Sequence, residues 1–297
     1  MKVGKGDKAV MAFILNKNLS VHSVDLNVKN LEEMMIYYRE TIGLSILEES
    51  DNYASFGVEA DNQILLNLIK TDAYVSQSKK AGLFHTAFLV PERKDLGNIL
   101  FALLKKEVPI EGAADHGYSE AVYLTDPEGN GIEIYRDKPK EDWDILENGM
   151  IKGITAEIDI DGVLASREDQ LVDILPAGTC IGHVHLSVTD LNDSQRFYID
   201  ILGMQLKYEF GSQARFIASG EYHHHVGLNT WLGTDIEKRD PYDLGLTRFT
   251  LGVKSPKELY ELKEYLSTRN VDIDDEAETF VTITDPSGIR VTVTTSE

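Results

Sequence analysis

The chain has 297 residues, of which 42% are hydrophobic, and this is enough for one large globular domain or two of ordinary size. Its formal net charge of −21 repels phosphate groups, which argues against nucleic acid or an anionic membrane surface as a partner. No apolar run approaches the roughly 20 residues of a membrane span, and the apolar run near the start is too short for a secretory signal. We therefore expect a cytoplasmic protein. The single cysteine, Cys180, excludes an internal disulfide, so a metal site would use histidine and carboxylate ligands.

Four segments of the chain repeat one plan: a short alternating strand, an amphipathic helix and then a run of strands. The expected opening strands are residues 24–28, 85–90, 183–188 and 248–253, and each alternates with the period of two that half-buried strands have. The expected helices begin after Asn30, at Arg93, after Asp190 and at Ser255. Asp190 is a good helix N-cap, and Pro256 suits the first helical position. The chain therefore reads as four βαβββ modules.

The modules match one another in alternation. Residues 37–44 of module one resemble residues 197–204 of module three, with Gly43 and Gly203 where a helix ends on a left-handed residue. Modules two and four share the Asp-Pro-x-Gly turn signal at residues 126–129 and 285–288. We therefore expect two related halves, at residues 18–136 and 180–297. The acidic residues 137–179 between them read as a linker, with a short helix near residues 164–175, or as an ordered strap.

Several of the eight histidines recur at equivalent positions of the repeat. His85 and His183 open the first strands of modules two and three, and Glu133 lies on the last strand of module two, just past the Asp-Pro turn. If the first and last strands of these modules form a cup, the three side chains converge. Two imidazoles and one carboxylate form the facial ligand set of non-haem Fe(II) oxygenases. We therefore predict a metal site at His85, Glu133 and His183.

Other histidines fall close to this predicted site. His183 and His185 are two residues apart on one strand, so their side chains share a face. His223 and His225 are expected to do the same on the last strand of module three. We expect His185, His223 and His224 to bind substrate.

At this point the chain resembles the vicinal oxygen chelate superfamily, which includes glyoxalases, bleomycin-resistance proteins and extradiol dioxygenases. Module two matches the extradiol signature through His116, Tyr123, the Asp126–Pro127 pair, Gly129 and Glu133, although Ala114 replaces the residue usual two positions before the histidine. The likeness is nearest to bacterial catechol 2,3-dioxygenases. The resemblance implies an α+β fold, in which four βαβββ modules pair into two cup-shaped mixed β-sheets with flanking helices.

The resemblance also implies roles for individual residues. His85, Glu133 and His183 match the metal ligands. His225 best matches the histidine that exchanges a proton near bound oxygen, with His224 as its nearest rival. His116 and Tyr123 match residues that hydrogen-bond the substrate oxygens.

Modules one and four depart from the family pattern. Module four has Arg248 and Thr292 where the histidine and glutamate ligands would lie, and module one has Ser23 in place of His183. The ligands therefore belong to modules two and three, and the simplest arrangement pairs two with three and one with four.

The resemblance thus implies an extradiol ring-cleaving dioxygenase that acts on a catechol and O2 with Fe(II), or with Mn(II), which accepts the same ligands. It implies a homo-oligomer as well. The alternatives are a dioxygenase that cleaves hydroquinone, a glyoxalase-like metal-dependent isomerase or lyase, and a metal-free protein that binds a small molecule. The sequence does not specify the ring substituents.

Overall fold

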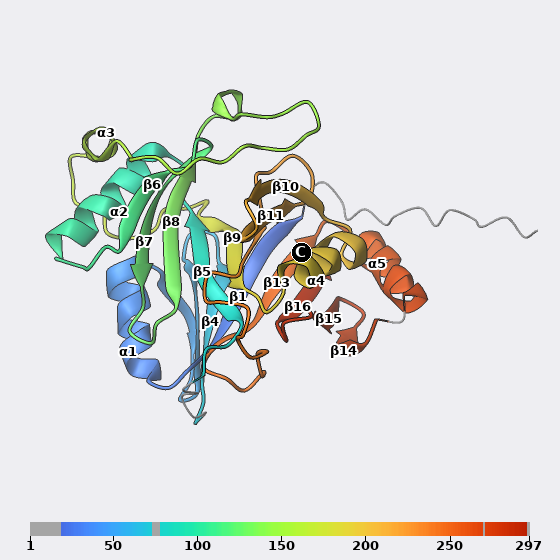
Figure 1. The fold of residues 1–297 in the computed structure, drawn as a ribbon. Coiled ribbons are helices and arrows are strands. Elements are labelled where there is room, and N and C mark those ends of the chain that lie inside the picture. Colours follow the sequence, from blue (N-terminus) through green and yellow to red (C-terminus); the bar gives the residue numbers. More distant parts are fainter. Residues whose placement is uncertain (1–18, 73–77, 270, 296–297) are drawn as a thin grey trace, which may run out of the picture.

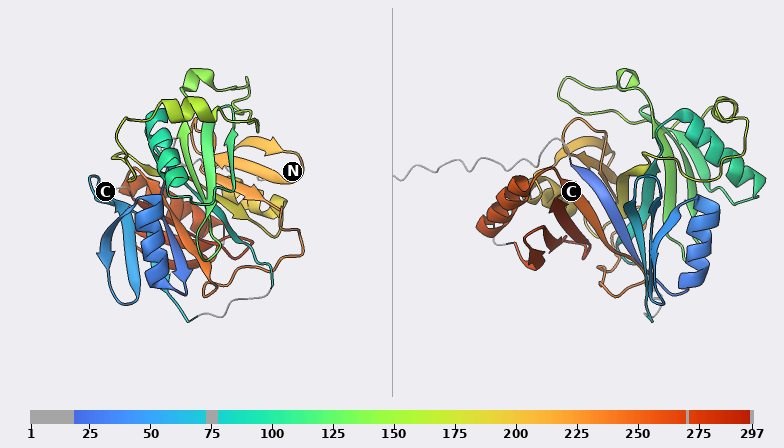
Figure 2. Two further views of the ribbon diagram at one scale, coloured as in Figure 1. Left: turned by 90° about the vertical axis from the view of Figure 1, so that its left-hand side faces the viewer. Right: turned by 180° about the vertical axis from the view of Figure 1, so that it is seen from behind.

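The computed structural model describes residues 19–72, 78–269 and 271–295 of the chain. It has the predicted α+β architecture, with mixed β-sheet in the middle, α1 and α2 on one side, and α4 and α5 on the other (Figure 1). The view from behind shows the same order (Figure 2).

The first half of the chain contains modules one and two. Module one consists of β1 (Ser20–Val28), α1 (Leu31–Ile36) with its π-helical continuation η1 (Tyr37–Ile42), β2 (Ser45–Glu49), β3 (Tyr53–Val58) and β4 (Gln63–Lys70). Module two consists of β5 (Gly82–Leu89), α2 (Arg93–Lys105), β6 (Gly112–Asp115), β7 (Ser119–Thr125) and β8 (Gly131–Asp137). Both have the predicted βαβββ order.

The second half repeats this order in modules three and four. Module three consists of β9 (Cys180–Ser187), α4 (Leu191–Arg196) with π-helical η3 (Phe197–Ile201), β10 (Gln205–Phe210), β11 (Ala214–Ala218) and β12 (Val226–Asn229). Module four consists of β13 (Gly245–Val253), α5 (Pro256–Thr268), β14 (Ile273–Ala277), β15 (Phe280–Thr284) and β16 (Arg290–Thr295). Each of the helices α1, α2, α4 and α5 packs on strands of its own module.

The strand pairing joins modules from different halves of the chain. β5 of module two pairs antiparallel with β9 of module three, and β1 of module one pairs antiparallel with β13 of module four. We call the first unit, modules two and three, the histidine cup, and the second, modules one and four, the arginine cup. The two cups join where Val21 of β1 pairs with Ile181 of β9. This confirms the expected pairing, and in the described part of the chain each cup takes its strands from both halves of the sequence.

Local signals explain where the helices begin and end. The side chains of Asn30, Asp190 and Ser255 each accept a hydrogen bond from a backbone N–H in the first turn, as N-caps do. Gly43 and Gly203 follow the π-helical turns with φ of 87° and 71°, in the left-handed region where glycine has no steric penalty.

The Asp-Pro turns are fixed by their aspartates. Asp126 Oδ1 accepts hydrogen bonds from the backbone N–H groups of Glu128 and Asn130, and Tyr38 of module one donates its hydroxyl to Oδ2. This turn sets the start of β8, the strand that carries Glu133.

Residues 138–179 form an ordered strap with a short 3₁₀ turn, η2 (Lys140–Asp142), and one short helix, α3 (Ile160–Ala165). The helix lies earlier than the predicted residues 164–175, because Asp159 caps its start through the backbone N–H of Gly162. The strap arches beyond β8 towards β10 (Figure 1), where Ile151 donates its backbone N–H to the carbonyl of Lys207.

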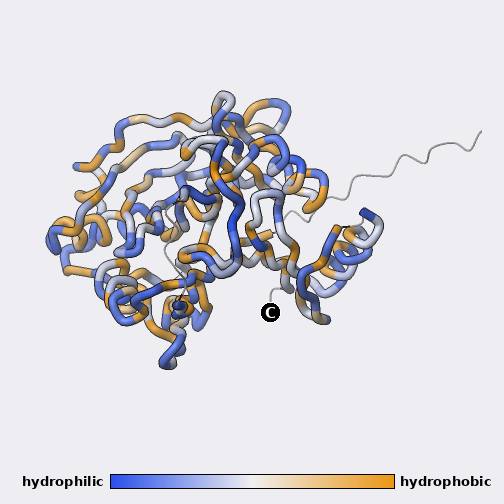
Figure 3. Tube along the Cα trace, turned by 60° about the horizontal axis from the view of Figure 1, so that its bottom comes forward, coloured by the Kyte–Doolittle hydropathy of each residue, from blue (hydrophilic) through white to orange (hydrophobic). Residues whose placement is uncertain are grey.

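Hydropathy alternates over short distances along the chain trace (Figure 3). Within the described residues, no helix combines the length and the apolar character needed to cross a membrane.

Candidate metal centre

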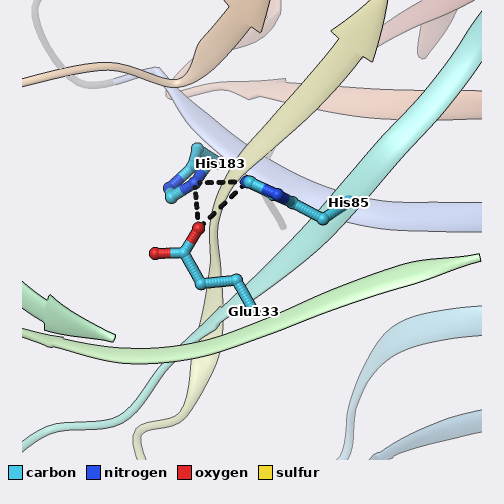
Figure 4. A group of neighbouring side chains, drawn as sticks. All are labelled: His85, Glu133 and His183. Atoms are coloured by element: carbon cyan, nitrogen blue, oxygen red, sulfur yellow. Dashed lines mark hydrogen bonds and ion pairs between the residues drawn. The ribbon is translucent and has the colours of Figure 1, made fainter. Parts of the chain in front are cut away.

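Three buried side chains from three strands of the histidine cup converge on one point (Figure 4). His85 comes from β5, Glu133 from β8 and His183 from β9. Glu133 Oε2 lies 2.9 Å from His85 Nε2 and 3.2 Å from His183 Nε2, and the two Nε2 atoms are 3.3 Å apart. Among the described residues, this is the group of three whose ligand atoms all lie close enough to share a metal ion.

The three ligand atoms fit a metal ion of the first transition series. Neighbouring ligands of an octahedral ion with bonds of about 2.1 Å lie about 3 Å apart, close to the three separations seen here. One carboxylate oxygen and two imidazole nitrogens on one side of an ion leave its other positions open. The described residues therefore fit a catalytic metal rather than a closed structural one.

The protonation states also suit a metal. Burial lowers the pKa of His183 to about 4, which keeps its imidazole neutral at physiological pH. Burial alone would raise the pKa of Glu133, but the adjacent His183 and His85 rings outweigh it and hold this pKa well below its ordinary value. A neutral imidazole and an ionised carboxylate are the forms that bind metals.

Packing orients the His183 ring. His183 Nδ1 is buried and has no hydrogen-bond partner among the described residues. The rings of His224 and Tyr135 lie with their centroids 4.0 Å and 5.0 Å from that of His183. In many metal sites the second nitrogen of a ligating histidine donates a hydrogen bond that orients the ring. Here contact with these two rings orients His183 instead.

A cavity of about 320 Å³ opens beside the three ligands. This is near the lower end of the ~300–1,000 Å³ found for small-molecule sites. Its walls are mainly aromatic and apolar, and they include Phe84, Phe210, Phe216 and Trp231. Glu133 is the one carboxylate among the residues described in its lining, which includes no lysine or arginine.

Two of the predicted site residues form a hydrogen-bonded pair in the cavity wall. Tyr123 on β7 lies 2.6 Å through its hydroxyl from His116 Nε2, and His116 Nδ1 lies 2.9 Å from the backbone carbonyl of Ile154 in the strap. A carbonyl only accepts, so Nδ1 carries the proton, and the Nε2 of a neutral His116 accepts from the tyrosine. Burial raises the pKa of Tyr123 well above its ordinary value, so the phenol stays protonated.

His185 also lies in the cavity wall, as predicted from its position two residues after His183. It pairs with His85 across β9 and β5, and its Nε2 is buried without a hydrogen-bond partner in the described part of the chain. Burial lowers the pKa of His185 well below its usual value, so the ring is neutral. An unpaired buried nitrogen is costly unless a ligand or water completes it.

The three consecutive histidines are not on a strand. β12 begins at Val226, so the expectation that His223 and His225 share a strand face is wrong. His224 lines the cavity. His225 does not belong to the described cavity lining, and its Nδ1 accepts a hydrogen bond from the backbone N–H of Ser219. His223 lies behind His224, with their Nδ1 atoms 2.7 Å apart.

Sequence reasoning missed Phe84 and Trp231, whose rings lie 5.1 Å apart in the cavity wall. The register of β5 shifts between Leu83 and His85, so the consecutive residues Phe84 and His85 both reach the cavity. Trp231 lies in the turn after β12, where no strand or helix periodicity predicts the direction of its side chain. Sequence reasoning also missed Asp137, whose carboxylate lies 2.9 Å from His223 Nε2.

Comparisons with known proteins agree with this architecture. The family described as the Glyoxalase/Bleomycin resistance protein/Dioxygenase superfamily matches residues 20–134 and 180–293. The chain belongs to this superfamily. A protein of Bacillus subtilis (strain 168) named catechol-2,3-dioxygenase is 34% identical over 247 residues, which are 82% of this chain and 86% of the relative. This similarity supports a dioxygenase of the superfamily.

Solved structures show the same fold. A putative dioxygenase from Bacillus subtilis superposes with a TM-score of 0.62 at 12% identity, covering 94% of this chain and 86% of the other. Glyoxalase I from Zea mays superposes with a TM-score of 0.57 at 16% identity, covering 94% and 92%. At these identities the likeness concerns the fold and not the reaction.

Proposed function

We propose that this chain is an Fe(II)-dependent extradiol dioxygenase that cleaves the ring of a catechol with O2. The observation that carries the proposal is the position of the three converging ligands, His85, Glu133 and His183, at the wall of a small aromatic cavity. The hydrogen-bonded Tyr123–His116 pair in the same wall supports it, and so does the similarity to the catechol-2,3-dioxygenase of Bacillus subtilis.

Fe(II) would supply Lewis acidity and the electron transfer that lets O2 react with a catechol. The cavity walls hold the ring, since Phe84 and Trp231 meet edge to face and offer apolar surface to an aromatic guest. Tyr123, whose proton is directed at His116, offers its phenol oxygen to the substrate, and His185 offers its unpaired Nε2. These contacts would orient the diol relative to the ligands.

We assign proton transfer to His224 rather than His225. His224 lines the cavity, and its ring centroid is 4.0 Å from that of His183, whereas His225 contacts Tyr222 away from the described lining. Burial lowers the pKa of His224 well below its ordinary value, so the ring is neutral and can accept a proton from a catechol hydroxyl. The proton returns when the product forms. Both atoms of O2 end in the ring-opened product, so no further reductant is consumed.

The cavity lining favours a neutral substituent on the ring. No lysine or arginine belongs to the described lining, so a carboxylate on the substrate would lie among aromatic rings without a cation. We therefore expect catechol and its alkyl or aryl derivatives as substrates, in preference to dihydroxybenzoates.

The test is a reconstitution with Fe(II) under anaerobic conditions, followed by addition of catechol in air. We expect a yellow ring-opened product and the uptake of one O2 for each catechol consumed. An enzyme with bound iron that leaves catechol unchanged but cleaves hydroquinone, or isomerises a glyoxalase substrate, would refute the proposal. Comparing 3-methylcatechol with 3,4-dihydroxybenzoate tests the substituent preference separately, and equal kcat/KM values for the two would refute only that preference.

A further inference from the structure

One part of the cavity wall comes from the strap between the two halves of the chain. Gly153, Ile154 and Thr155 line the cavity together with residues of modules two and three. The superfamily match covers residues 20–134 and 180–293, so these three residues lie outside it. What they contribute to the cavity is therefore a property of this chain and not of the family pattern.

Backbone hydrogen bonds hold this part of the strap at both ends. At one end, Ile151 donates its N–H to the carbonyl of Lys207 on β10, over 2.8 Å. At the other end, Ala156 and Asp115 of β6 exchange two backbone hydrogen bonds, of 2.9 Å and 3.0 Å. Residues 151–156 therefore form a fixed link between β10 and β6, beside the cavity.

Ile154 lies at the rim of the cavity. It belongs to the lining and is yet 47% exposed, and Phe210 on β10 combines the same two properties at 49%. The backbone N–H of Ile154 donates to the carbonyl of His116, and a Cβ atom on Gly117 would lie 3.4 Å from Ile154 Cγ1. The residue is thus seated on the turn after β6. Apolar side chains exposed together beside an apolar cavity indicate a surface that a ligand covers.

The cavity is larger than an unsubstituted catechol requires. An apolar cavity of about 150 Å³ is enough to bind benzene, whereas this one has about 320 Å³. In the proposed function the diol end of the substrate is oriented by the metal ligands and by the pair of Tyr123 and His116. A substituent on the ring would fill the remaining volume, which opens to solvent at the rim.

We infer that Ile154 is a specificity-determining residue, which contacts the apolar substituent of the ring together with Phe210. The strap then decides which substituted catechols bind well. This inference rests on the proposed function for the orientation of the diol, whereas contact between the strap and a substituent can be measured without turnover. The carbonyl of the same residue lies 2.9 Å from His116 Nδ1, so one residue of the strap supports both the rim and the polar wall.

The experiment compares Ile154→Ala with Ile145→Ala. Ile145 is the matched control, because it is an isoleucine of the same strap, is 48% exposed and does not belong to the described lining. Calorimetry on the zinc-loaded protein without O2 measures the dissociation constants of catechol, 3-butylcatechol and 4-butylcatechol. We expect Ile154→Ala to reduce the preference for the tighter butylcatechol over catechol about 5- to 10-fold, since each buried methylene group contributes a factor of about four. Ile145→Ala should leave this preference unchanged.

A second variant tests the same contact by adding a charge. Ile154→Lys places a cation at the rim of a lining that has no lysine or arginine among its described residues. The affinity for 3-(3,4-dihydroxyphenyl)propanoate relative to catechol should rise about threefold, as for an exposed ion pair. Preferences within twofold of wild type in both Ile154 variants, or equal changes in Ile154→Ala and Ile145→Ala, would overturn the inference. If iron-loaded wild type cleaves no catechol, the proposed function fails, while the binding ratios still decide whether the strap contacts the substituent.

Discussion

The histidine cup and the arginine cup have the same strand pairing but different side chains at equivalent positions. Across β5 and β9, His85 pairs with His185 and Ala87 pairs with His183. Across β13 and β1, Arg248 pairs with Asp25 and Thr250 pairs with Ser23. At the ligand position of β8, occupied by Glu133 in the histidine cup, β16 has Thr292, which hydrogen-bonds Thr282 on the neighbouring strand.

In the arginine cup, Asp25 and Arg248, the residues equivalent to His185 and His85, are paired with each other. Arg248 donates to Asp25, Asn67 donates to the other oxygen of Asp25, and Ser55 donates to Asn67. In the histidine cup the equivalent groups point their lone pairs at one centre or remain unpaired. The comparison teaches that the fold does not need a metal at this position, and that the histidine cup carries the energetic cost of polar groups that only a ligand can complete.

The largest expected effect comes from replacing Glu133 on β8 by alanine, compared with the same replacement of its equivalent on β16, Thr292. Glu133→Ala removes the one carboxylate of the proposed ligand set. We expect loss of most bound iron and a fall in turnover of more than ~10²-fold, because mutation of residues that only support metal ligands already lowers activity by up to ~10²-fold. Metal analysis and oxygen uptake measure the two effects. Thr292→Ala, the matched change in the arginine cup, should alter neither. Iron retained by Glu133→Ala would remove Glu133 from the ligand set.

A second difference concerns the two Asp-Pro turns. Asp126 and Asp285 each accept two backbone N–H groups and one tyrosine hydroxyl, but Asn130 adds a fourth hydrogen bond to Asp126, where module four has Ile289. Burial raises the pKa of Asp285 to about 6, so the folded protein holds this proton at pH values where the unfolded chain has lost it.

Stability should therefore fall as the pH rises from about 4 to about 6, because the stabilising protonated form exists in the folded state below this range and is lost above it. A pKa that rises from 3.8 to about 6 corresponds to about 3 kcal/mol in the free energy of unfolding. Urea unfolding of wild type and Asp285→Asn at a series of pH values measures this, since the variant lacks the titrating group. Parallel curves for the two proteins across this range would refute the prediction. Asp126→Asn, in the other turn, should remove a second contribution of the same sign, because burial raises the pKa of Asp126 as well.

The repeat, the turns and the convergence of His85, Glu133 and His183 could all be predicted from the sequence, because each depends on a local pattern. Period-two alternation defines the opening strands, and the Asp-Pro signal places Glu133 at a fixed distance after a turn. Equivalent positions in two modules then bring His85 and His183 to the same place by symmetry. Modules one and four have Ser23 and Arg248 where modules three and two have histidines. This difference predicted that modules two and three pair with each other, as they do.

The rest of the site depends on contacts that no local pattern encodes. The run from His223 to His225 shows neither the period of a strand nor that of a helix, so the sequence does not tell whether it belongs to the strand that follows, β12. His223 packs instead against Tyr118 and Trp143, which are distant in sequence. Phe84 reaches the cavity through an irregularity in β5 that its sequence does not mark. The strap looks like a linker because it is acidic and aperiodic, yet its Ile154 carbonyl fixes a histidine of the cavity wall.

The smallest expected effect comes from breaking the ion pair that the arginine cup has in place of a metal site. Asp25 is buried, while the Arg248 side chain is 46% exposed, so solvent weakens their attraction and much of the cost arises from the hydrogen bonds. We expect Asp25→Ala to lower the free energy of unfolding by about 2 kcal/mol, measured by urea titration, with unchanged iron content and turnover. Arg248→Ala and the double variant complete a cycle, and a coupling energy of about 1 kcal/mol would show that the two side chains act as a pair. Loss of iron in Asp25→Ala would instead mean that the two cups are coupled through the junction of Val21 and Ile181, and that the metal site depends on more than its own cup.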